Sequence, residues 1–311
     1  MIHNVSDLLS RFNNRDERAL ARGISLLESG LPAGQELLSN VRIEVGGAQL
    51  IGVTGSPGSG KSTLVDGLIG VARGRGKRVA VIAVDPTSPF SGGAILGDRI
   101  RMLRWHQDED VYIRSMSTRG HLGGLAAATL QVLTLLDAYG FDVIFIETVG
   151  VGQSEVDIVK IADSTLLVLT PGMGDGVQAF KSGVMEIADV FAINKFDLPG
   201  AQRLKREIKA ALDLGHPSDP DWFPTIAETI ASEGAGVEDL FEKLLEHRSY
   251  LETSGRLESS RQQRHTSEAS ALLAQALDQA IKNADPTILA YLQAGKLSPA
   301  EALRKLVASS K

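Results

Sequence analysis

Short apolar, β-branched runs alternate along the centre of the chain with stretches in which an apolar residue recurs every three or four positions. Several of these runs are continuously apolar, which is typical of strands buried on both faces of a parallel sheet. The expected strands are residues 49–53, 78–84, 111–116, 142–148, 164–170, 190–193 and 224–230. The expected helices between them are residues 62–73, 124–138, 176–187 and 202–214. The pattern predicts an α/β fold with a mainly parallel central sheet flanked by helices.

Both ends of the chain depart from this alternation. Near the start, Asn14 is expected to cap a helix with Glu17 as its N3 partner. Near the other end, helical spacing covers 269–281, and Ser298 is expected to cap a last helix with Glu301 at N3. The predicted regions are a helical extension at 1–45, an α/β domain at 46–254 and a helical arm at 255–311. The arm either covers the core or forms a dimer contact.

The first chemical motif lies between the expected strand 49–53 and the helix that follows it. Residues 54–63 contain the pattern Gly-x-x-x-x-Gly-Lys-Ser in the strand–loop–helix order of a nucleoside-triphosphate phosphate loop. Backbone N–H groups and the helix N-terminus would bind phosphate oxygens, Lys61 would reach the β- and γ-phosphates, and Ser62 would bind Mg²⁺. The residues expected to touch the nucleotide here are Gly55, Ser56, Pro57, Gly58, Ser59, Gly60, Lys61, Ser62 and Thr63.

A second motif indicates which base is bound. Asn194-Lys195-Phe196-Asp197 follows an apolar strand, which is the guanine-reading arrangement of GTPases. The Asp197 carboxylate can accept hydrogen bonds from N1–H and the 2-amino group of guanine, whereas adenine offers neither donor. Asn194 would tie the base site to the phosphate loop, and the Lys195 stem would pack along the base. Backbone groups of Ser232, Glu233 and Gly234 are expected near guanine O6. The chain is therefore predicted to bind GTP and GDP.

Acidic residues just after strands are candidate Mg²⁺ ligands. Asp85 follows the expected strand 78–84, and Glu147 lies at the tip of the strand 142–148, where GTPases place a Walker-B carboxylate. Asp98 lies on the loop after Asp85 and has a helix N-cap as its alternative role. The predicted metal ligands are Ser62, Asp85, Asp98 and Glu147, and the predicted catalytic residues are Lys61, Glu147 and Asp98.

The residue that positions the attacking water is left open by the sequence. Gln153 could orient water, with a structural role in its loop as the alternative. Asp175 or Lys181, in a glycine-rich loop, could couple the nucleotide state to a partner, with a simple loop as the alternative. Four arginines are candidates for an arginine finger by location only: Arg99, Arg101, Arg104 and Arg119.

Composition narrows the class of partner. The chain has 311 residues, a formal net charge of −6 and no cysteine. An acidic balance gives no bulk attraction to nucleic acid or to an anionic membrane. No apolar run approaches the ~20 residues that span a bilayer, and the first residues lack the pattern of a secretory signal. Without cysteine there is neither a disulfide nor a thiolate metal ligand, which agrees with a cytoplasmic protein.

These motifs together resemble one family. The phosphate loop, Glu147 to Glu155, the Asp98-Arg99-Ile100-Arg101-Met102 segment and the Asn194 to Asp197 motif are similar to the metallochaperone-type (SIMIBI) P-loop GTPases. Within that class they resemble the methylmalonyl-CoA mutase-associated GTPase chaperones, also called the ArgK/MeaB type. The resemblance implies a homodimeric, Mg²⁺-dependent GTPase that binds an adenosylcobalamin-dependent acyl-CoA mutase and gates the loading of its cofactor. It also implies a dimerisation arm at 255–311.

Three alternatives stay open at this point. A nickel-insertion GTPase metallochaperone shares the class but normally needs a Cys/His metal site, and this chain has no cysteine and only isolated histidines. A P-loop kinase linked to amino-acid transport is permitted by the phosphate loop and disfavoured by the guanine motif. A scaffold that binds GTP without hydrolysing it is the third. The sequence does not indicate which mutase is the client or whether this chain touches cobalamin.

Overall fold

The computed structural model describes residues 5–41, 47–85, 102, 104–117, 127–148, 161–172, 184–214, 219, 221–282, 290–291, 294–298, 300–301 and 304. Of the residues expected to matter above, Asp98, Arg99, Arg101, Arg119, Gln153, Asp175 and Lys181 lie outside these ranges. So do 124–126 and 176–183 of two expected helices. All structural statements below concern the described residues.

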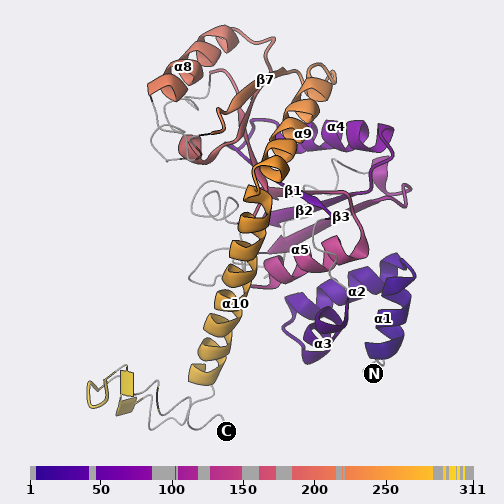
Figure 1. Cartoon of the computed structure of the whole chain (residues 1–311), viewed down its shortest axis with the longest axis vertical. Helices are drawn as coiled ribbons and strands as arrows, with labels where there is room; N and C mark the ends of the chain where they lie inside the picture. The colour runs from indigo at the N-terminus through magenta and orange to yellow at the C-terminus, as the bar shows by residue number, and fades with distance from the viewer. Residues whose placement is uncertain are drawn as a thin grey trace. The chain divides into compact units, whose positions relative to one another are not determined.

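A parallel sheet forms the centre of the described fold (Figure 1). Its seven strands have the order β3-β2-β4-β1-β5-β6-β7, and every neighbouring pair is parallel. The strands are β1 (Gln49–Thr54), β2 (Val79–Asp85), β3 (Val111–Ser117), β4 (Val143–Thr148), β5 (Ser164–Leu169), β6 (Val190–Asn194) and β7 (Thr225–Thr229). Each expected strand is present, with ends that differ by at most one residue. The predicted fold class, a P-loop-type α/β fold, is confirmed.

Helices cover both faces of the sheet. The described helices of this part are α4 (Lys61–Gly74), α5 (Ala127–Tyr139), α8 (Ala201–Leu214) and α9 (Val237–Thr253), and Val184–Ile187 forms a 3₁₀ turn. On one face, α4 and α9 pack Leu68 and Phe241 onto Val53 and Phe145. On the other, α8 packs with the alternate strand residues of β5 and β6. Helix α9 is absent from the expected elements, although its buried residues Val237, Leu240, Phe241 and Leu244 have helical spacing.

The N-terminal region forms three helices, as expected for a helical extension. They are α1 (Val5–Asn13), α2 (Glu17–Glu28) and α3 (Pro32–Asn40), and α2 packs on α5. The expected N-cap at Asn14 is wrong. The cap of α2 is Asp16, whose carboxylate accepts a hydrogen bond of 2.8 Å from the Arg18 backbone N–H. Asn14 instead donates its backbone N–H to Ser10 at the end of α1.

The C-terminal part begins with a long helix, α10 (Arg256–Lys282). It starts earlier than the spacing at 269–281 indicates, because its first turns are fixed by charged contacts rather than by an apolar stripe. Arg264 forms an ion pair with the fully buried Asp163 carboxylate, and Arg261 donates a 3.2 Å hydrogen bond to the Ala48 carbonyl. Ser298 and Glu301 form the expected reciprocal cap, with Ser298 N 3.0 Å from the Glu301 carboxylate. By contacts the chain divides into two compact units, 1–264 and 265–311.

A cluster of buried polar side chains joins α9 to the amino end of β6. The His247 ring lies 3.5 Å from the Asp189 carboxylate, and it shares a 2.8 Å hydrogen bond with the Ser164 hydroxyl. The other oxygen of Asp189 accepts a 2.7 Å hydrogen bond from the Thr165 backbone N–H. Trp222 packs against the His247 ring, with centroids 4.7 Å apart. Burial raises the pKa of Asp189 to about 7 and lowers the pKa of His247 to about 4.

Candidate nucleotide-binding site

The loop between β1 and α4 is held in place by close backbone approaches. Gly55 has φ of +142°, and a Cβ added there would lie 2.2 Å from the Val168 carbonyl oxygen of β5. Gly60, the N-cap of α4, has φ of +91°, and a Cβ there would lie 2.3 Å from Nδ2 of Asn194. Both positions therefore need glycine for conformation and for space. They place the loop at the carboxyl ends of the central strands, where ligands bind in open α/β sheets.

Lys61 points back into this loop from the first turn of α4. Its Nζ donates hydrogen bonds to the carbonyl of Gly55 at 2.6 Å and to that of Ser56 at 3.1 Å. The residue is only 7 % exposed. A buried ammonium group held at the mouth of a loop of backbone N–H groups favours the binding of a polyanion. The helix N-terminus adds partial positive charge at the same place.

Ser62 and Glu147 meet at the next position. The Ser62 hydroxyl donates a 2.6 Å hydrogen bond to Oε1 of Glu147, at the end of β4, and Glu147 is 1 % exposed. A hydroxyl and a carboxylate side by side are the hard oxygen donors that Mg²⁺ prefers, so these residues fit the predicted metal. Asp85 ends β2, which pairs with β4 as far as Val84 and Thr148, and its backbone therefore lies at the same edge of the sheet. The described residues contain no group of three or more His, Cys, Asp or Glu that could hold a metal.

The base-reading motif begins at the end of β6 and is tied to the phosphate loop. The Asn194 amide donates a 2.8 Å hydrogen bond to the Ser59 carbonyl. Its oxygen accepts hydrogen bonds from the Ala231 backbone N–H at 3.0 Å and from the Thr229 hydroxyl at 3.3 Å. Asn194 thus joins three loops, and the buried Thr229 is a member of the site that the sequence analysis does not include. No linear pattern marks Thr229, because its role arises from the pairing of β6 with β7.

The next residues differ in their exposure. Lys195 has φ of +56° and donates a 2.9 Å hydrogen bond from Nζ to the Gly58 carbonyl, so its amino group as well as its stem contacts the loop. Asp197 is exposed and therefore accessible to a base. Ser232, Glu233 and Gly234 form an exposed turn after β7, closed by a bridge between Ile230 and Ala235. The structure thus brings the two predicted motifs and this turn to one end of the sheet.

One candidate arginine has a different role in the structure. Arg104 forms a 2.7 Å ion pair with Asp66 of α4, and it stacks over the Trp105 ring with its guanidinium 4.7 Å from the ring centroid. The Trp105 indole N–H donates a 2.7 Å hydrogen bond to the same Asp66 carboxylate. Arg104 therefore joins its segment to α4. The other three candidates lie outside the described residues.

The phosphate loop, the Walker-B carboxylate and the Asn-Lys-x-Asp motif on a parallel sheet define a P-loop GTPase. The chain belongs to the methylmalonyl-CoA mutase-associated GTPase MeaB family, whose model matches residues 20–286. It is a GTP-hydrolysing enzyme of that family.

The similarity extends to curated relatives and to a solved structure. A protein of Pyrococcus abyssi named as a GTPase is 52 % identical over 262 residues, which is 84 % of this chain and 81 % of the relative. The mouse methylmalonic aciduria type A homolog, named as mitochondrial, is 37 % identical over 218 residues, 69 % of this chain and 52 % of the relative. The crystal structure of a LAO/AO transport system kinase has a TM-score of 0.73 at 26 % identity, and the match covers 99 % of this chain and 98 % of that one. None of the described helices has the length and hydropathy to cross a bilayer.

Proposed function

We propose that this GTPase is a Mg²⁺-dependent chaperone of an adenosylcobalamin-dependent acyl-CoA mutase of the methylmalonyl-CoA mutase type, gating cofactor loading and protecting or reactivating the mutase. The mutase is supported by the family description, which names it. The single structural observation that carries GTP binding is the contact of Asn194 with Ser59, because it couples the base motif to the phosphate loop. We also propose that the protein is cytoplasmic, where GTP is available as its substrate.

In this proposal the residues of the site have separate roles in GTP hydrolysis. Lys61 and the backbone N–H groups of residues 55, 56 and 58–62 bind and orient the phosphates. Ser62 and Glu147, with Asp85 and with Asp98 from outside the described residues, would hold Mg²⁺, which would neutralise charge at the β- and γ-phosphates. Asp197 selects guanine and Asn194 holds the base loop against the phosphate loop. Since no arginine finger is found among the described residues, we expect slow turnover that rises when the client orders the loops near the γ-phosphate.

The first experiment measures GTP turnover with and without purified adenosylcobalamin-dependent mutases from the same organism, with ATP as the control nucleotide. Stimulation by one mutase, with GTP only, supports the proposal and identifies the client. An unchanged turnover with every mutase contradicts the chaperone role and leaves a GTPase with a different client.

A kinase is the second candidate, because the solved relative carries that name. A kinase transfers the γ-phosphoryl group to an acceptor, whereas a GTPase transfers it to water. Radiolabelled γ-phosphate should therefore appear only as inorganic phosphate. Label recovered on a small molecule or on a transport protein would favour the kinase. The nickel-insertion alternative is disfavoured by the sequence, because such proteins normally need a Cys/His metal site and this chain has no cysteine and only isolated histidines.

We further propose a homodimer that uses the arm at 255–311. Leu273 on α10 is 72 % exposed, so a second copy of the arm could cover this apolar side chain. Light scattering on the wild type and on Leu273→Asp tests this. A dimer mass that falls to the monomer mass in the variant supports the contact, and a monomeric wild type contradicts it.

A further inference from the structure

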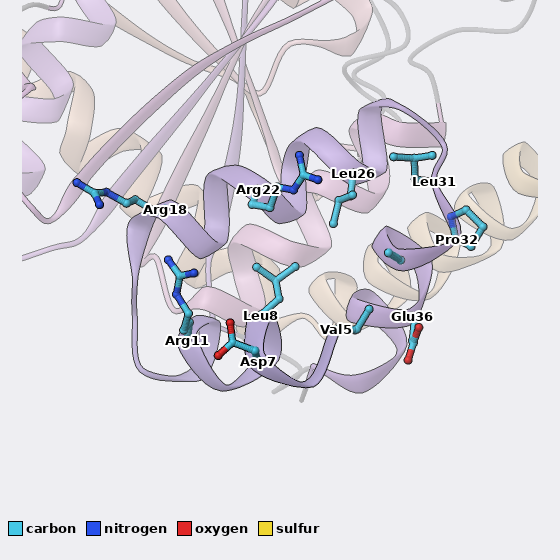
Figure 2. Close-up of a pocket in the computed structure, with 11 residues that line it drawn as sticks. Val5, Asp7, Leu8, Arg11, Arg18, Arg22, Leu26, Leu31, Pro32 and Glu36 are labelled. Carbon is cyan, nitrogen blue, oxygen red and sulfur yellow. The ribbon is translucent and has the colours of Figure 1, made fainter. Parts of the chain in front are cut away.

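Helices α1, α2 and α3 form an open pocket of about 930 Å³ (Figure 2). None of its lining residues belongs to the nucleotide site. Its floor is apolar, because Leu8 of α1 and Leu26 of α2 are each 6 % exposed and face it. Leu31, at the start of α3, keeps 46 % of its surface exposed at the rim. The pocket is therefore a groove with an apolar floor, lined by three helices and open to solvent.

Arginines distinguish one end of this groove from the other. Arg18, Arg22 and Leu26 line it at positions i, i+4 and i+8 of α2, so they form one row about 12 Å long. Figure 2 shows Arg11 and Arg18 towards one end, and Leu31 and Pro32 towards the other. Along this row on α2, charge thus gives way to apolar surface. The lining also includes two acidic side chains, Asp7 beside Arg11 and Glu36 beside Pro32.

The two arginines of α2 have no described acidic partner. Arg11 forms a 2.8 Å ion pair with Asp16, which is itself the cap of α2. For Arg18 and Arg22 no ion pair is found within the described part of the chain, and both are exposed. Two cations one helical turn apart, beside an apolar floor, favour a ligand with carboxylates at the same spacing.

We propose that this groove binds an amphipathic α-helix of a partner protein, with two carboxylates one turn apart facing Arg18 and Arg22 and apolar side chains facing Leu26 and Leu31. A helix fits better than a small anionic amphiphile, because the row on α2 is about 12 Å long and a helix lying along it would repeat its side chains at the same spacing of one turn, whereas a small amphiphile has one anionic group. In helix-in-groove binding the inserted helix carries its anchors at i, i+3 or i+4, and i+7, so a partner helix can place two carboxylates and an apolar side chain along one row. With the client mutase as the partner protein, the proposal deepens the proposed function and rests on it.

The groove itself is tested with a fluorescent helical peptide that carries Glu at two positions one turn apart and Leu one turn further. A matched peptide has Lys in place of both Glu residues. We expect saturable binding of the Glu peptide to the full chain, with a Kd below about 1 mM. The double variant Arg18→Glu, Arg22→Glu should weaken that binding at least tenfold and gain affinity for the Lys peptide. Because both arginines are exposed and have no described ion pair, the fold should be retained, as circular dichroism would show.

The control variant makes the same charge change elsewhere. Arg203 and Arg206 are exposed on α8, and Arg203→Glu, Arg206→Glu should leave peptide binding unchanged. Equal binding of the Glu peptide to all three proteins, or no binding up to about 1 mM, overturns the proposal. Saturable binding of decanoate that is lost in the Arg18, Arg22 variant, without binding of the peptide, overturns it in favour of a small amphiphile.

A second measurement identifies the partner. GTP turnover stimulated by the client mutase is compared in the two double variants. Loss of stimulation in the Arg18, Arg22 variant alone supports the mutase as occupant, and equal stimulation in both overturns it. If the wild type is not stimulated by any mutase, the proposed function fails, while the peptide experiment still decides whether the groove binds a helix.

Discussion

The Ser62 hydroxyl donates a 2.6 Å hydrogen bond to Glu147, and this contact joins the first turn of α4 to the end of β4. The two residues are far apart in sequence, yet both are buried, at 6 % and 1 % exposure. A pair so placed holds two oxygen donors in fixed relation before any metal arrives. Mg²⁺ bound by these two residues, as proposed, would need little rearrangement of the protein.

Removing the charge of Glu147 should reduce hydrolysis without unfolding the chain. In Glu147→Gln the amide oxygen can still accept the Ser62 hydrogen bond, but the carboxylate charge is lost. We expect the rate of GTP turnover to fall by at least about 100-fold. A higher Mg²⁺ concentration should be needed for half-maximal activity. Glu246→Gln, on the exposed face of α9, is the matched control. Full activity of Glu147→Gln at low Mg²⁺ would exclude Glu147 as a metal-associated residue.

Asp197 should determine the choice of base. In Asp197→Asn one carboxylate oxygen is replaced by an amide –NH₂ group, a donor that would face the donors of guanine. We expect GDP affinity to fall by about 10²- to 10⁴-fold. Xanthine nucleotides should bind this variant better than guanine nucleotides, since their 2-oxo group accepts a hydrogen bond. Competition against a fluorescent nucleotide measures both, and Asp213→Asn on α8 serves as the control. Unchanged guanine preference would refute the assignment.

Substitutions at two glycines should distinguish the effect of backbone strain from that of a steric clash. Gly60 and Gly76 both have positive φ, +91° and +70°, but only at Gly60 would a Cβ meet an atom, 2.3 Å away on Asn194. Gly76→Ala should cost about 1–2 kcal/mol of unfolding free energy and leave GTP binding intact. Gly60→Ala should also weaken GTP binding at least about tenfold, because Asn194 must leave its contact with the loop. Calorimetric titration with GDP and denaturant unfolding are the two measurements. Equal GDP affinity in both variants would contradict the steric account.

Asp189 and His247 should have opposite effects on stability as pH changes. The folded pKa of His247 lies below its unfolded value, so the unfolded chain binds the extra proton and stability falls as pH drops from about 6.5 towards 4. The folded pKa of Asp189 lies above its unfolded value, so stability falls as pH rises from about 4 towards 7. In the wild type the two contributions oppose each other over most of this window. Nearby Asp219 and Asp163 favour the charged histidine, and Asp219 also raises the Asp189 pKa.

Single variants should expose each contribution. Relative to the wild type, Asp189→Asn should gain stability as pH rises between about 4.5 and 6.5, by up to about 1.4 kcal/mol per pH unit. His247→Gln should lose stability over the same range. The Asp189→Asn slope should be the shallower of the two, because the Asp189 side chain keeps 21 % exposure and that of His247 only 4 %. Urea unfolding at several pH values gives both slopes. Slopes of the same sign would show that burial does not set these two pKa values.

The sequence predicted the sheet well because several strands are continuous apolar runs bounded by polar or glycine residues. Each motif directly follows a strand, so the sequence also predicted that the motifs lie together at the carboxyl ends of the parallel strands. Contacts between distant residues were not predictable. Thr229 joins the site only through the pairing of β7 with β6, and the first turns of α10 are fixed by Asp163, far away in sequence. The Asn14 cap was wrong because two capping residues stand close together, and the end of α1 decides between them.

The position of β1 in the sheet affects how the enzyme is made. Its neighbours are β4, which pairs Val143 with Gln49, and β5, which pairs Ser164 with Ile51. A ribosome therefore releases the phosphate loop long before it releases the two strands that flank β1. Until β4 and β5 are synthesised, β1 has neither of its neighbouring strands, so the phosphate loop is not held in place. These pairings are non-local and must close a long stretch of chain. Nucleotide thus cannot assist the early steps of folding on the ribosome, and GTP stabilises only a chain synthesised at least as far as β5.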